Sequence, residues 1–508
     1  MTFSHDQSFV ELVDASCAEH AARPALFHGG RAISYGELAA LVEGWTTALL
    51  DRGAGPDRCV ALWLPNGPAF VAAFLATLRL GAVVAPFGVL LTGHEVKERL
   101  AIAQATVLVT TGALEGQLGG LPISVLAVDP GAAGGAGLGP AGSVAAPRRS
   151  IYRAGDDVAV LISTSGTTGK PKAAELTHRG LTWNAIALAE GLALGPQDVQ
   201  LAVAPLSHVL GMTGVMNASL ISGAAFALME RFDPAAAVAL MAQTGTTGVL
   251  GAPPMFAALV REARRANLSH RLRFGMAGGA PLPASVRNAV EETFGCVLRD
   301  GYGMSEVGGG VTLTPLDESP RPQSVGPAFP GTEIRIVDLA TGEALGPGLA
   351  GEVAVRSPSV MRRYRGDDEA TRAALTSDGW LLTGDIGYLD GDGYLFLVDR
   401  KKELVIRSGY NVYPREVEDV LRSFPGVVEA AVLGVPDEEH GEEVVALVVP
   451  APGHDLEPEA VKAFARERLA AYKYPRRVVV VADLPRGPTG KVLKAQIDRQ
   501  RLLPSPKA

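Results

Sequence analysis

The sequence predicts an α/β protein that ends in a smaller α+β unit. Residues 1–130 alternate between helical spacing of apolar residues, as in 35–51, and short apolar runs such as 60–64 and 106–110. This alternation is typical of a sheet with helices on its faces. The length of 508 residues is enough for about three domains. The 60 glycines and 35 prolines indicate many turns rather than disorder.

The composition excludes several classes of function. A net charge of −8 argues against nucleic acid as the main partner, because such proteins usually carry a basic face. The most apolar stretch, 70–91, contains Arg79, so we predict a buried helix and then a strand at 82–86 rather than a membrane span. The amino-terminal residues 1–7 carry no secretion signal. Three widely spaced cysteines favour a reducing, cytoplasmic location: Cys17, Cys59 and Cys296.

The pattern changes in the second half of the chain. A Gly/Ala/Pro/Ser-rich segment at 131–147 predicts a flexible surface connection. We place the boundary of the last unit within 399–403, a charged stretch after a strand. Further strands are expected at 158–162, 200–204, 224–229, 248–251, 333–337, 351–356, 394–398, 427–435, 444–449 and 477–481, and helices at 417–424, 457–471 and 491–502.

The strongest local signal is the segment Leu161–Lys172, in which an apolar strand runs into hydroxyl residues, glycines and lysines. Consecutive backbone N–H groups in such a turn can form an anion site. A Walker A loop is excluded because only two residues separate Gly166 from Gly169, and Pro171 follows the lysine. From composition alone, a phosphate site and a polar surface turn remain equal alternatives.

Six further segments carry chemically suggestive residues. Each alone has an ordinary structural explanation, such as a hydrogen-bonded histidine, a tight turn, a surface ion pair or a solvated side chain. They are Pro205–His208 with Gly211, Met276–Pro281, Asp300–Glu306, Trp380–Asp385 with Arg400, Lys401–Glu416, and Leu484–Lys491.

Taken in order, the seven segments resemble those of the adenylate-forming superfamily, which includes acyl-CoA synthetases. The resemblance extends to 24–37 and 57–84 and so covers nearly the whole chain. It implies a large domain over 1–400, built of two layered α/β sheets and a small distorted β-barrel. It also implies a small mobile α+β domain over 401–508.

The resemblance also implies roles for individual residues. Tyr302 would stack on adenine, Asp300 would accept from its amine, and Asp385 with Arg400 would bind the ribose. The other nucleotide-binding residues would be Thr164, Ser165, Gly166, Thr167, Thr168, Gly169, Lys172, Gly279, Ala280, Gly301, Gly303 and Ser305. Residues lining the acyl pocket would be His208, Gly211, Met212, Gly278, Met304 and Gly309.

Four further assignments follow from the same resemblance. Glu306 and Thr164 would hold Mg²⁺, a hard cation that prefers oxygen ligands. Lys491 would bridge the substrate carboxylate and the α-phosphate, and together with Glu306 and His208 it completes the implied catalytic set. Gly409 would line the CoA tunnel, and Lys402 would be the hinge.

The implied reaction is ATP-dependent activation of a carboxylic acid to acyl-AMP, followed by thioester formation with coenzyme A. The residues that bound the predicted pocket are small or apolar, which favours a medium- or long-chain fatty acid or an aryl acid over a charged one. No arginine follows the turn at 253–258, where malonate-using members carry one, although Arg261 lies nearby. The glycines at 308–310 indicate room or flexibility.

Several alternatives remain open at this stage. The acceptor of the acyl group could be a carrier protein, or the acid could be a short malonyl-type substrate. A non-enzymatic acyl- or nucleotide-binding regulator is a third alternative. An unrelated P-loop hydrolase is disfavoured by the glycine spacing. The sequence is also compatible with a homodimer.

Overall fold

The computed structural model describes residues 7–128, 151, 153, 155–165, 171–408, 410–437, 440–486 and 492–502. The chain forms two compact units, one of Met1–Ile334 with Val355–Leu381 and one of Arg335–Ala354 with Leu382–Ala508. The predicted connection at 131–147 lies outside the described residues. Within the described part of the chain, no helix combines the length and apolar character that a bilayer crossing requires.

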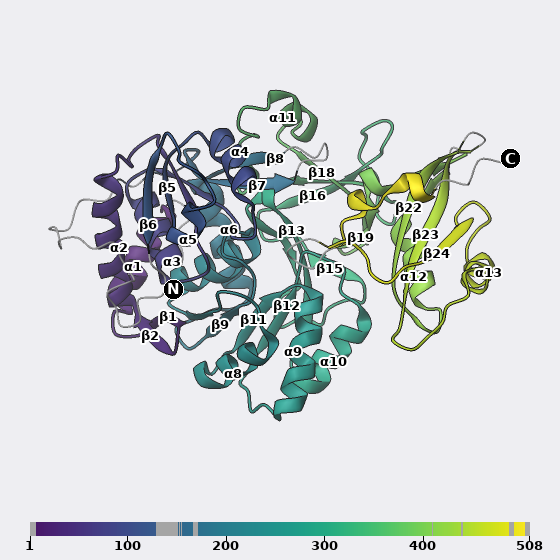
Figure 1. The fold of residues 1–508 in the computed structure, drawn as a ribbon, viewed down its shortest axis with the longest axis horizontal. Coiled ribbons are helices and arrows are strands. Elements are labelled where there is room, and N and C mark those ends of the chain that lie inside the picture. Colours follow the sequence, from purple (N-terminus) through teal and green to yellow (C-terminus); the bar gives the residue numbers. More distant parts are fainter. Residues whose placement is uncertain are drawn as a thin grey trace. The chain divides into compact units, whose positions relative to one another are not determined.

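The first unit contains an eight-stranded sheet whose interior strands run parallel (Figure 1). Its antiparallel pairs lie at the two edges, between β14 and β13 and between β1 and β2. The order is β14 (Gly309–Leu313), β13 (Leu298–Met304), β12 (Phe274–Ala277), β11 (Gly248–Gly251), β9 (Val199–Ala202), β10 (Ala225–Leu228), β1 (Pro24–His28) and β2 (Arg31–Ser34). Strand β15 (Ser324–Pro327) lies beside β13 and β14.

A second sheet of the first unit confirms the strands predicted near 60–64, 82–86, 106–110 and 158–162. Its order is β6 (Ser124–Val128), β5 (Ala105–Thr111), β3 (Cys59–Trp63), β4 (Val83–Pro86), β7 (Val158–Ser165) and β8 (Pro171–Thr177). The strands from β6 to β7 pair in parallel, and β8 turns back antiparallel to β7. Thr164 of β7 therefore lies opposite Lys172 of β8.

The helices of the first unit start at clear sequence signals. Ser8, Ser34 and Thr92 cap helices α1 (Phe9–Glu19), α2 (Tyr35–Leu50) and α4 (Gly93–Ala103), each in a reciprocal pair with a glutamate three residues later. The others are α3 (Pro68–Arg79), α5 (Gly112–Glu115), α6 (His178–Gly191), η1 (Leu210–Asn217), α7 (Ala218–Ser222), α8 (Pro234–Thr244), α9 (Pro253–Ala266), α10 (Ala284–Phe294), η2 (Ser305–Val307) and α11 (Asp368–Ala374). In Figure 1, α8, α9 and α10 lie together along the sheet strands β9, β11 and β12.

Helix α3 confirms the prediction that the apolar stretch is a buried helix. All of its residues except one are buried, and Arg79 at its end pairs with Asp14 of α1 and Glu43 of α2. The arginine is thus neutralised inside the protein, which explains how a charge is accommodated in so apolar a segment.

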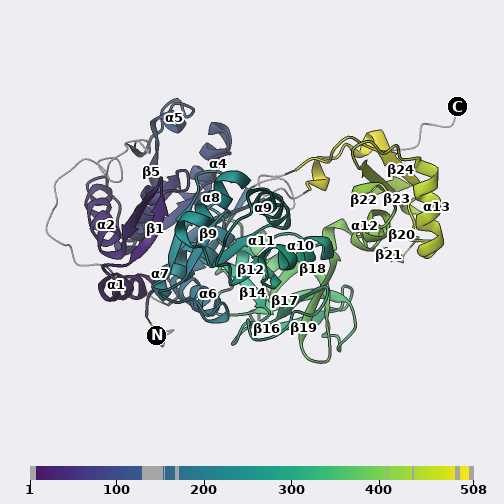
Figure 2. The same cartoon turned by 90° about the horizontal axis from the view of Figure 1, so that it is seen from below.

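The second unit contains most of a smaller sheet and a complete α+β layer. The smaller sheet has neighbouring strands β19 (Tyr394–Arg400), β18 (Leu381–Leu389), β17 (Gly351–Arg356) and β16 (Glu333–Val337). The α+β layer has strands β21 (Tyr410–Val412), β20 (Val405–Arg407), β23 (Gly441–Pro450), β22 (Val427–Asp437) and β24 (Arg477–Val480). Figure 2 shows helices α12 (Pro414–Arg422) and α13 (Pro458–Arg468) beside strands β22, β23 and β24.

The helix predicted over 491–502 is wrong for the described residues. They form two separate 3₁₀ turns, η4 (Lys494–Gln496) and η5 (Arg499–Leu502). Val492, Ile497 and Leu502 pack on the apolar face of β22 and β23. Their spacing of five does not fit the 3.6-residue period of a helix, so burial of these three side chains favours an irregular path.

Candidate functional site

The predicted nucleotide segments of the first unit follow the carboxyl ends of parallel strands. Strands β9, β12 and β13 belong to one sheet. The predicted segment 205–211 follows β9, segment 276–281 begins at the end of β12, and segment 300–306 begins within β13. Parallel strands deliver their carboxyl ends to one edge, which is where α/β proteins bind ligands. The fold thus gathers segments that are about 100 residues apart in the chain.

The segments 276–281 and 300–306 lie side by side. Ala277 is opposite Asp300, and a Cβ atom on Gly278 would lie 3.7 Å from the Gly301 carbonyl oxygen. Gly279 has φ +79° and nothing within 4 Å of its Cβ position, so one side of this turn is open and flat. The next residue, Ala280, is half-buried. This arrangement suits a planar group laid against backbone.

Asp300 and Tyr302 are buried, with 8% and 7% of their surface exposed. The Tyr302 amide donates to Thr312 Oγ1 at 3.2 Å. A Cβ atom on Gly303 would lie 2.1 Å from the Gly309 carbonyl oxygen, so only glycine fits at this antiparallel crossing of β13 and β14. The glycine that follows Tyr302 is therefore required by the packing of the two strands.

Glu306 is linked through Tyr364 to Lys172 on β8, one of the two strands that flank the predicted phosphate loop. It lies in η2 next to Ser305, and Tyr364 Oη donates to its Oε1 at 2.8 Å. Lys172 Nζ lies 5.0 Å from the centroid of the Tyr364 ring. Burial, reinforced by the Glu306 carboxylate, raises the pKa of the Tyr364 hydroxyl, so it stays a donor at physiological pH.

His208 lies in the loop between β9 and η1. Asn66 fixes the start of this loop, because its side-chain amide donates to the Ala204 carbonyl at 3.2 Å and accepts from the Leu206 amide at 2.8 Å. A Cβ atom on Gly211 would lie 2.4 Å from the Pro205 carbonyl oxygen, which explains the glycine there. The loop is therefore held at both ends.

The protonation of His208 follows from its contacts. His208 is exposed to solvent, and the protein packed around the imidazole lowers its pKa below the usual value. Nδ1 accepts from the Leu210 amide at 3.3 Å. A neutral imidazole that accepts at Nδ1 carries its proton at Nε2, so His208 presents a hydrogen-bond donor and no positive charge.

The glycines at 308–310 do not provide the room or flexibility predicted from the sequence. A Cβ atom on Gly309 would lie 2.5 Å from Asn184 Oδ1, and one on Gly310 would lie 2.7 Å from the Phe329 ring. Asn184 donates to the Val307 and Gly310 carbonyls and accepts from the Gly310 amide. These glycines allow tight packing, because the backbone itself is the surface against which Asn184 lies.

The helix that follows His208 is of the rare π type. Met212 and Thr213 of η1 are fully buried, and Thr213 Oγ1 donates to the Gly308 carbonyl at 2.6 Å. π-type turns are frequent at functional sites. Here the wide turn carries two of the predicted acyl-pocket residues, Gly211 and Met212, and Thr213 joins it to the turn that follows Glu306. Met304, the remaining predicted pocket residue, is half-buried at the end of β13.

The second unit pairs two of the predicted residues. Asp385 of β18 and Arg400 of β19 are opposite each other in the antiparallel register, and Arg400 Nε lies 3.2 Å from Asp385 Oδ1. Lys402, the predicted hinge residue, is exposed in η3 (Lys401–Glu403). Gly409 and Lys491 lie outside the described residues.

The phosphate loop is described only at its two ends. Thr164 is half-buried in β7, and Lys172 is half-buried opposite it in β8. The backbone of Ser165 belongs to β7. The loop residues Gly166, Thr167, Thr168 and Gly169 lie outside the described part of the chain.

The donor set at Glu306 fits Mg²⁺. In the described part of the chain there is no cluster of three or more His, Cys, Asp or Glu side chains that could hold a metal ion alone. A single carboxylate at Glu306 and a hydroxyl at Thr164 are hard oxygen donors, and Mg²⁺ commonly binds through one or two such groups together with nucleotide phosphates and water. We therefore expect the cation to arrive with the nucleotide.

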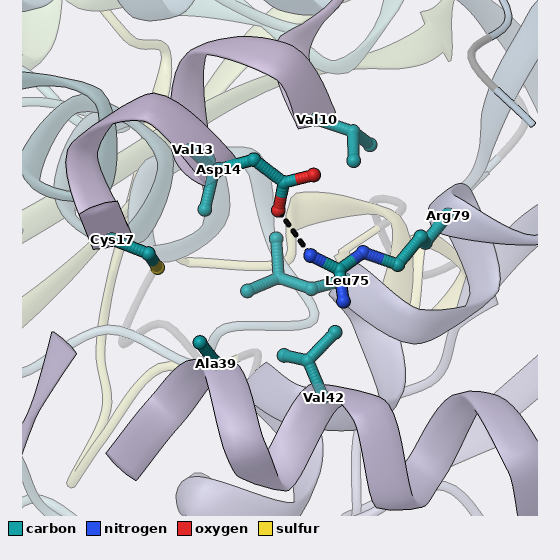
Figure 3. A pocket seen from close by; sticks show the side chains of 8 residues that line it. All are labelled: Val10, Val13, Asp14, Cys17, Ala39, Val42, Leu75 and Arg79. Atoms are coloured by element: carbon teal, nitrogen blue, oxygen red, sulfur yellow. Dashed lines mark hydrogen bonds and ion pairs between the residues drawn. The ribbon is translucent and has the colours of Figure 1, made fainter. Parts of the chain in front are cut away.

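A small cavity lies away from these residues, between α1, α2 and α3 (Figure 3). Its volume is about 10 Å³, which is room for a single water molecule. Mostly apolar side chains line it, together with the Asp14–Arg79 ion pair drawn in Figure 3. Burial raises the pKa of the Cys17 thiol on its wall to about 12, so this thiol is unreactive. This cavity belongs to the core.

Sequence reasoning missed the residues that hold the site loops. Asn66, Asn184 and Tyr364 all bond to backbone or side chains of the predicted segments from a distance in the chain. The only local signal was at Asn66, inside a Pro-Asn-Gly-Pro turn. The other two sit in ordinary helical or loop sequence, and only the tertiary structure reveals their partners.

The comparisons with known proteins agree with this geometry. The AMP-binding enzyme family matches residues 13–365, and the AMP-binding enzyme C-terminal domain matches residues 416–491. The chain is 37% identical over 485 residues to a feruloyl-CoA synthase of Amycolatopsis sp, covering 94% of this chain and 95% of that protein. It is 34% identical over 510 residues to 4-coumarate–CoA ligase 5 of Oryza sativa subsp. japonica, covering 97% and 93%.

A solved structure extends the agreement to three dimensions. The crystal structure of ATP-bound MatB from Rhodopseudomonas palustris matches with a TM-score of 0.88 and 31% identity, covering 96% of this chain and 97% of that one. The chain therefore belongs to the AMP-binding enzyme family and is an adenylate-forming CoA ligase, which activates a carboxylic acid with ATP and forms its thioester with coenzyme A.

Proposed function

We propose that this ligase uses an aryl or fatty acid with an uncharged tail, with Mg²⁺-ATP as the nucleotide and free CoA as the acceptor. The observation that carries this choice is the chemistry of the predicted acyl pocket. Segments 208–213 and 278–280 contribute glycines, apolar side chains, one hydroxyl and a neutral histidine. A second carboxylate on the acid would find no cation among them, and burying an unpaired charge is costly.

Leu210 supports an apolar lining. Cβ atoms on Gly278 and Gly214 would lie 3.8 and 3.9 Å from Leu210 Cδ1, so this side chain lies between two backbone surfaces. A flat or extended apolar tail fits such a wall. Relatives named for feruloyl and coumarate thioesters make a hydroxycinnamic-type acid our first candidate, and a relative named for long-chain fatty acids makes these the second.

The first half-reaction joins the acid to AMP. A carboxylate oxygen attacks the α-phosphorus of ATP in line, that P–O bond forms, and the bond to pyrophosphate breaks. Glu306 and Thr164 would hold Mg²⁺, which supplies positive charge against the phosphate oxygens when bound. We also assign Lys172 and Lys491 to this step, in which their ammonium groups would stabilise the negative charge that develops on the phosphate oxygens.

We assign His208 an orienting role in this step. Its Nε2–H can donate to one oxygen of the substrate carboxylate, which turns the other oxygen toward phosphorus. A neutral donor suits this role better than a cation, because an imidazolium would hold the carboxylate as an ion pair and lower its nucleophilicity. Asp385 and Arg400 would bind the ribose hydroxyls, and Tyr302 with Gly279 and Ala280 would enclose adenine.

The second half-reaction transfers the acyl group to sulfur. The CoA thiol loses its proton, sulfur attacks the acyl carbon, and AMP leaves with the mixed-anhydride oxygen. We propose that residues 401–508 turn about Lys402 between the two steps, which withdraws Lys491 and brings Gly409 to the pantetheine tunnel. One site can then serve two reactions that need different polar groups.

A panel of acids tests the choice of substrate. We expect thioester formation with CoA to be fastest for hydroxycinnamic or benzoic acids or for medium-chain fatty acids, and slowest for malonate and succinate. A dicarboxylic acid as the best substrate would contradict the proposal. Activity only with a phosphopantetheinylated carrier protein, and none with free CoA, would favour the carrier-ligase alternative.

The proposed role of Lys491 has its own test. Lys491→Ala should lose acyl-AMP formation yet still convert supplied acyl-adenylate and CoA into thioester and AMP. The two half-reactions are followed separately by pyrophosphate release and thioester absorbance. An equal loss in both would show that the assignment of Lys491 is wrong.

The three cysteines also bear on location. Each is buried and unbridged in the structure. Buried thiols of this kind persist in a reducing compartment, which supports the cytoplasmic location that we propose.

A further inference from the structure

Tyr364 connects two segments that the reaction would use, although it belongs to neither. Its hydroxyl donates to Glu306 Oε1 at 2.8 Å, and its ring carries the Lys172 ammonium 5.0 Å from the centroid. Only 9% of the residue is exposed. The Glu306 carboxylate thus contacts the hydroxyl of Tyr364, and the Lys172 ammonium contacts its ring.

Two ion pairs to a buried glutamate hold the chain on either side of Tyr364. Tyr364 bridges to Ala174 of β8, and the next residue of that strand, Glu175, is 1% exposed. Arg363 Nε and Arg365 Nε donate to the two Glu175 oxygens at 3.0 and 2.9 Å. A buried carboxylate is stable only when well paired, so Glu175 holds the segment from both sides of Tyr364, although the Arg363 side chain is itself 48% exposed.

We propose that Tyr364 is a positioning residue that orients Glu306 toward the cation and keeps Lys172 from pairing with it. The hydroxyl occupies one carboxylate oxygen and leaves the other for the metal. The ring face attracts the ammonium, so Lys172 stays directed to phosphate oxygens instead of neutralising Glu306. This inference rests on the proposed role of Glu306 as a Mg²⁺ ligand.

The test measures how Mg²⁺ strengthens ATP binding when no acid is present, so no turnover is needed. Calorimetry gives the Kd for ATP over a series of Mg²⁺ concentrations for the parent protein and three variants, Tyr364→Phe, Glu306→Gln and the double variant. Loss of a hydrogen bond to a charged group should raise the half-maximal Mg²⁺ concentration about tenfold in Tyr364→Phe. Glu306→Gln should lose most of the Mg²⁺ response, and Tyr364→Phe should then add nothing to it.

A matched control separates positioning from stability. Tyr35→Phe also removes a buried tyrosine hydroxyl, which donates to the Ala224 carbonyl at 2.7 Å, and should leave the Mg²⁺ response unchanged. Tyr364→Phe should also keep thioester formation from supplied acyl-adenylate, which shows that the fold is intact.

Different outcomes test the role of Glu306 and the role of Tyr364 separately. An unaltered Mg²⁺ response in Glu306→Gln would overturn the proposed role of Glu306 itself. A lost response in Glu306→Gln with an unaltered one in Tyr364→Phe would overturn the positioning role of Tyr364. An equal loss of both half-reactions in Tyr364→Phe would also overturn it, because the tyrosine would then be purely structural.

Discussion

At the residue scale, Asn184 shows how one amide can organise a site loop. It lies in α6, is fully buried, and makes three hydrogen bonds to the backbone that follows Glu306. Side-chain amides can satisfy a donor and an acceptor at once, which suits a turn whose own groups cannot pair. The conformation of 307–310 therefore depends on a residue more than 120 positions away.

Replacement of Asn184 should be costly. Asn184→Ala leaves several backbone groups without partners in a buried turn, and we expect it to lower the free energy of unfolding by about 3 kcal/mol. Asn217→Ala is the matched control, because this fully buried amide has no hydrogen-bond partner among the described residues. It should change stability by less than about 1 kcal/mol. Urea unfolding measures both, and equal losses would contradict the importance of the Asn184 bonds.

His178 is a second residue whose environment has a measurable consequence. It is the first residue of α6 and only 1% exposed, and burial lowers the pKa of its imidazole to about 4. Asp157 opposes this shift and Arg153 adds to it. The positive end of the helix also disfavours a cation there.

This shift predicts lower stability in mild acid. The unfolded chain binds a proton at His178 near pH 6.5 whereas the folded chain does not until about pH 4, so stability is complete above pH 6.5 and falls below it. The expected loss is on the order of 2 kcal/mol between pH 7 and pH 5. His178→Gln should remove this part of the pH dependence, whereas His94→Gln, at an exposed histidine of α4, should retain it. An identical pH profile for both variants would be inconsistent with this account.

At the element scale, ion pairs and buried apolar side chains together fix the carboxyl-terminal segment, which forms no α-helix in its described residues. Lys494 of η4 lies 2.6 Å from Glu418 Oε1 and 3.0 Å from Glu403 Oε2, and its side chain is 14% exposed. Burial would lower the pKa of Lys494, but the two carboxylates raise it overall. Glu418 also accepts from the Val432 amide at 2.8 Å, so this cluster links η4, η3, α12 and β22.

Removal of the ammonium should therefore loosen the second unit. Lys494→Met removes the cation that Glu418 and Glu403 share but leaves Glu418 paired with Arg422, which lies 3.2 Å from its Oε2. We therefore expect a cost of about 2 kcal/mol, most of which Lys494→Arg should recover. Lys462→Met is the control, because its pair with Glu459 is at the surface and contributes little. Hydrogen exchange of the β22 and β23 amides reports the difference. Equal protection in the Met variants at 494 and 462 would refute the role of this cluster.

The elements also show where sequence patterns suffice. Helix α2, the strand after Gly81 and strands β16 and β17 are predicted almost to the residue, because apolar periodicity and caps are local signals. The last helix fails, because Lys494 and the apolar side chains of 492–502 are fixed by partners elsewhere in the chain. Periodicity cannot report such partners.

At the scale of the whole molecule, the order of motifs was sufficient to predict the fold and the chemistry. The motif order identifies the family, and the eight-stranded sheet of the first unit brings segments 276–281, 300–306 and 205–211 to one edge. The supporting residues Asn66, Asn184 and Tyr364 could not be predicted, because each acts through a contact distant in the chain. The assignment of movement to 401–508 and of individual roles to Lys402, Gly409 and Lys491 stays a prediction.

The most direct measurement of the central claim is the fate of ATP when purified protein is offered Mg²⁺, CoA and an aryl or fatty acid. The account predicts acid-dependent release of AMP and pyrophosphate, with one AMP formed for each thioester. Formation of ADP and phosphate instead, or no AMP with any acid in a broad panel, would contradict it.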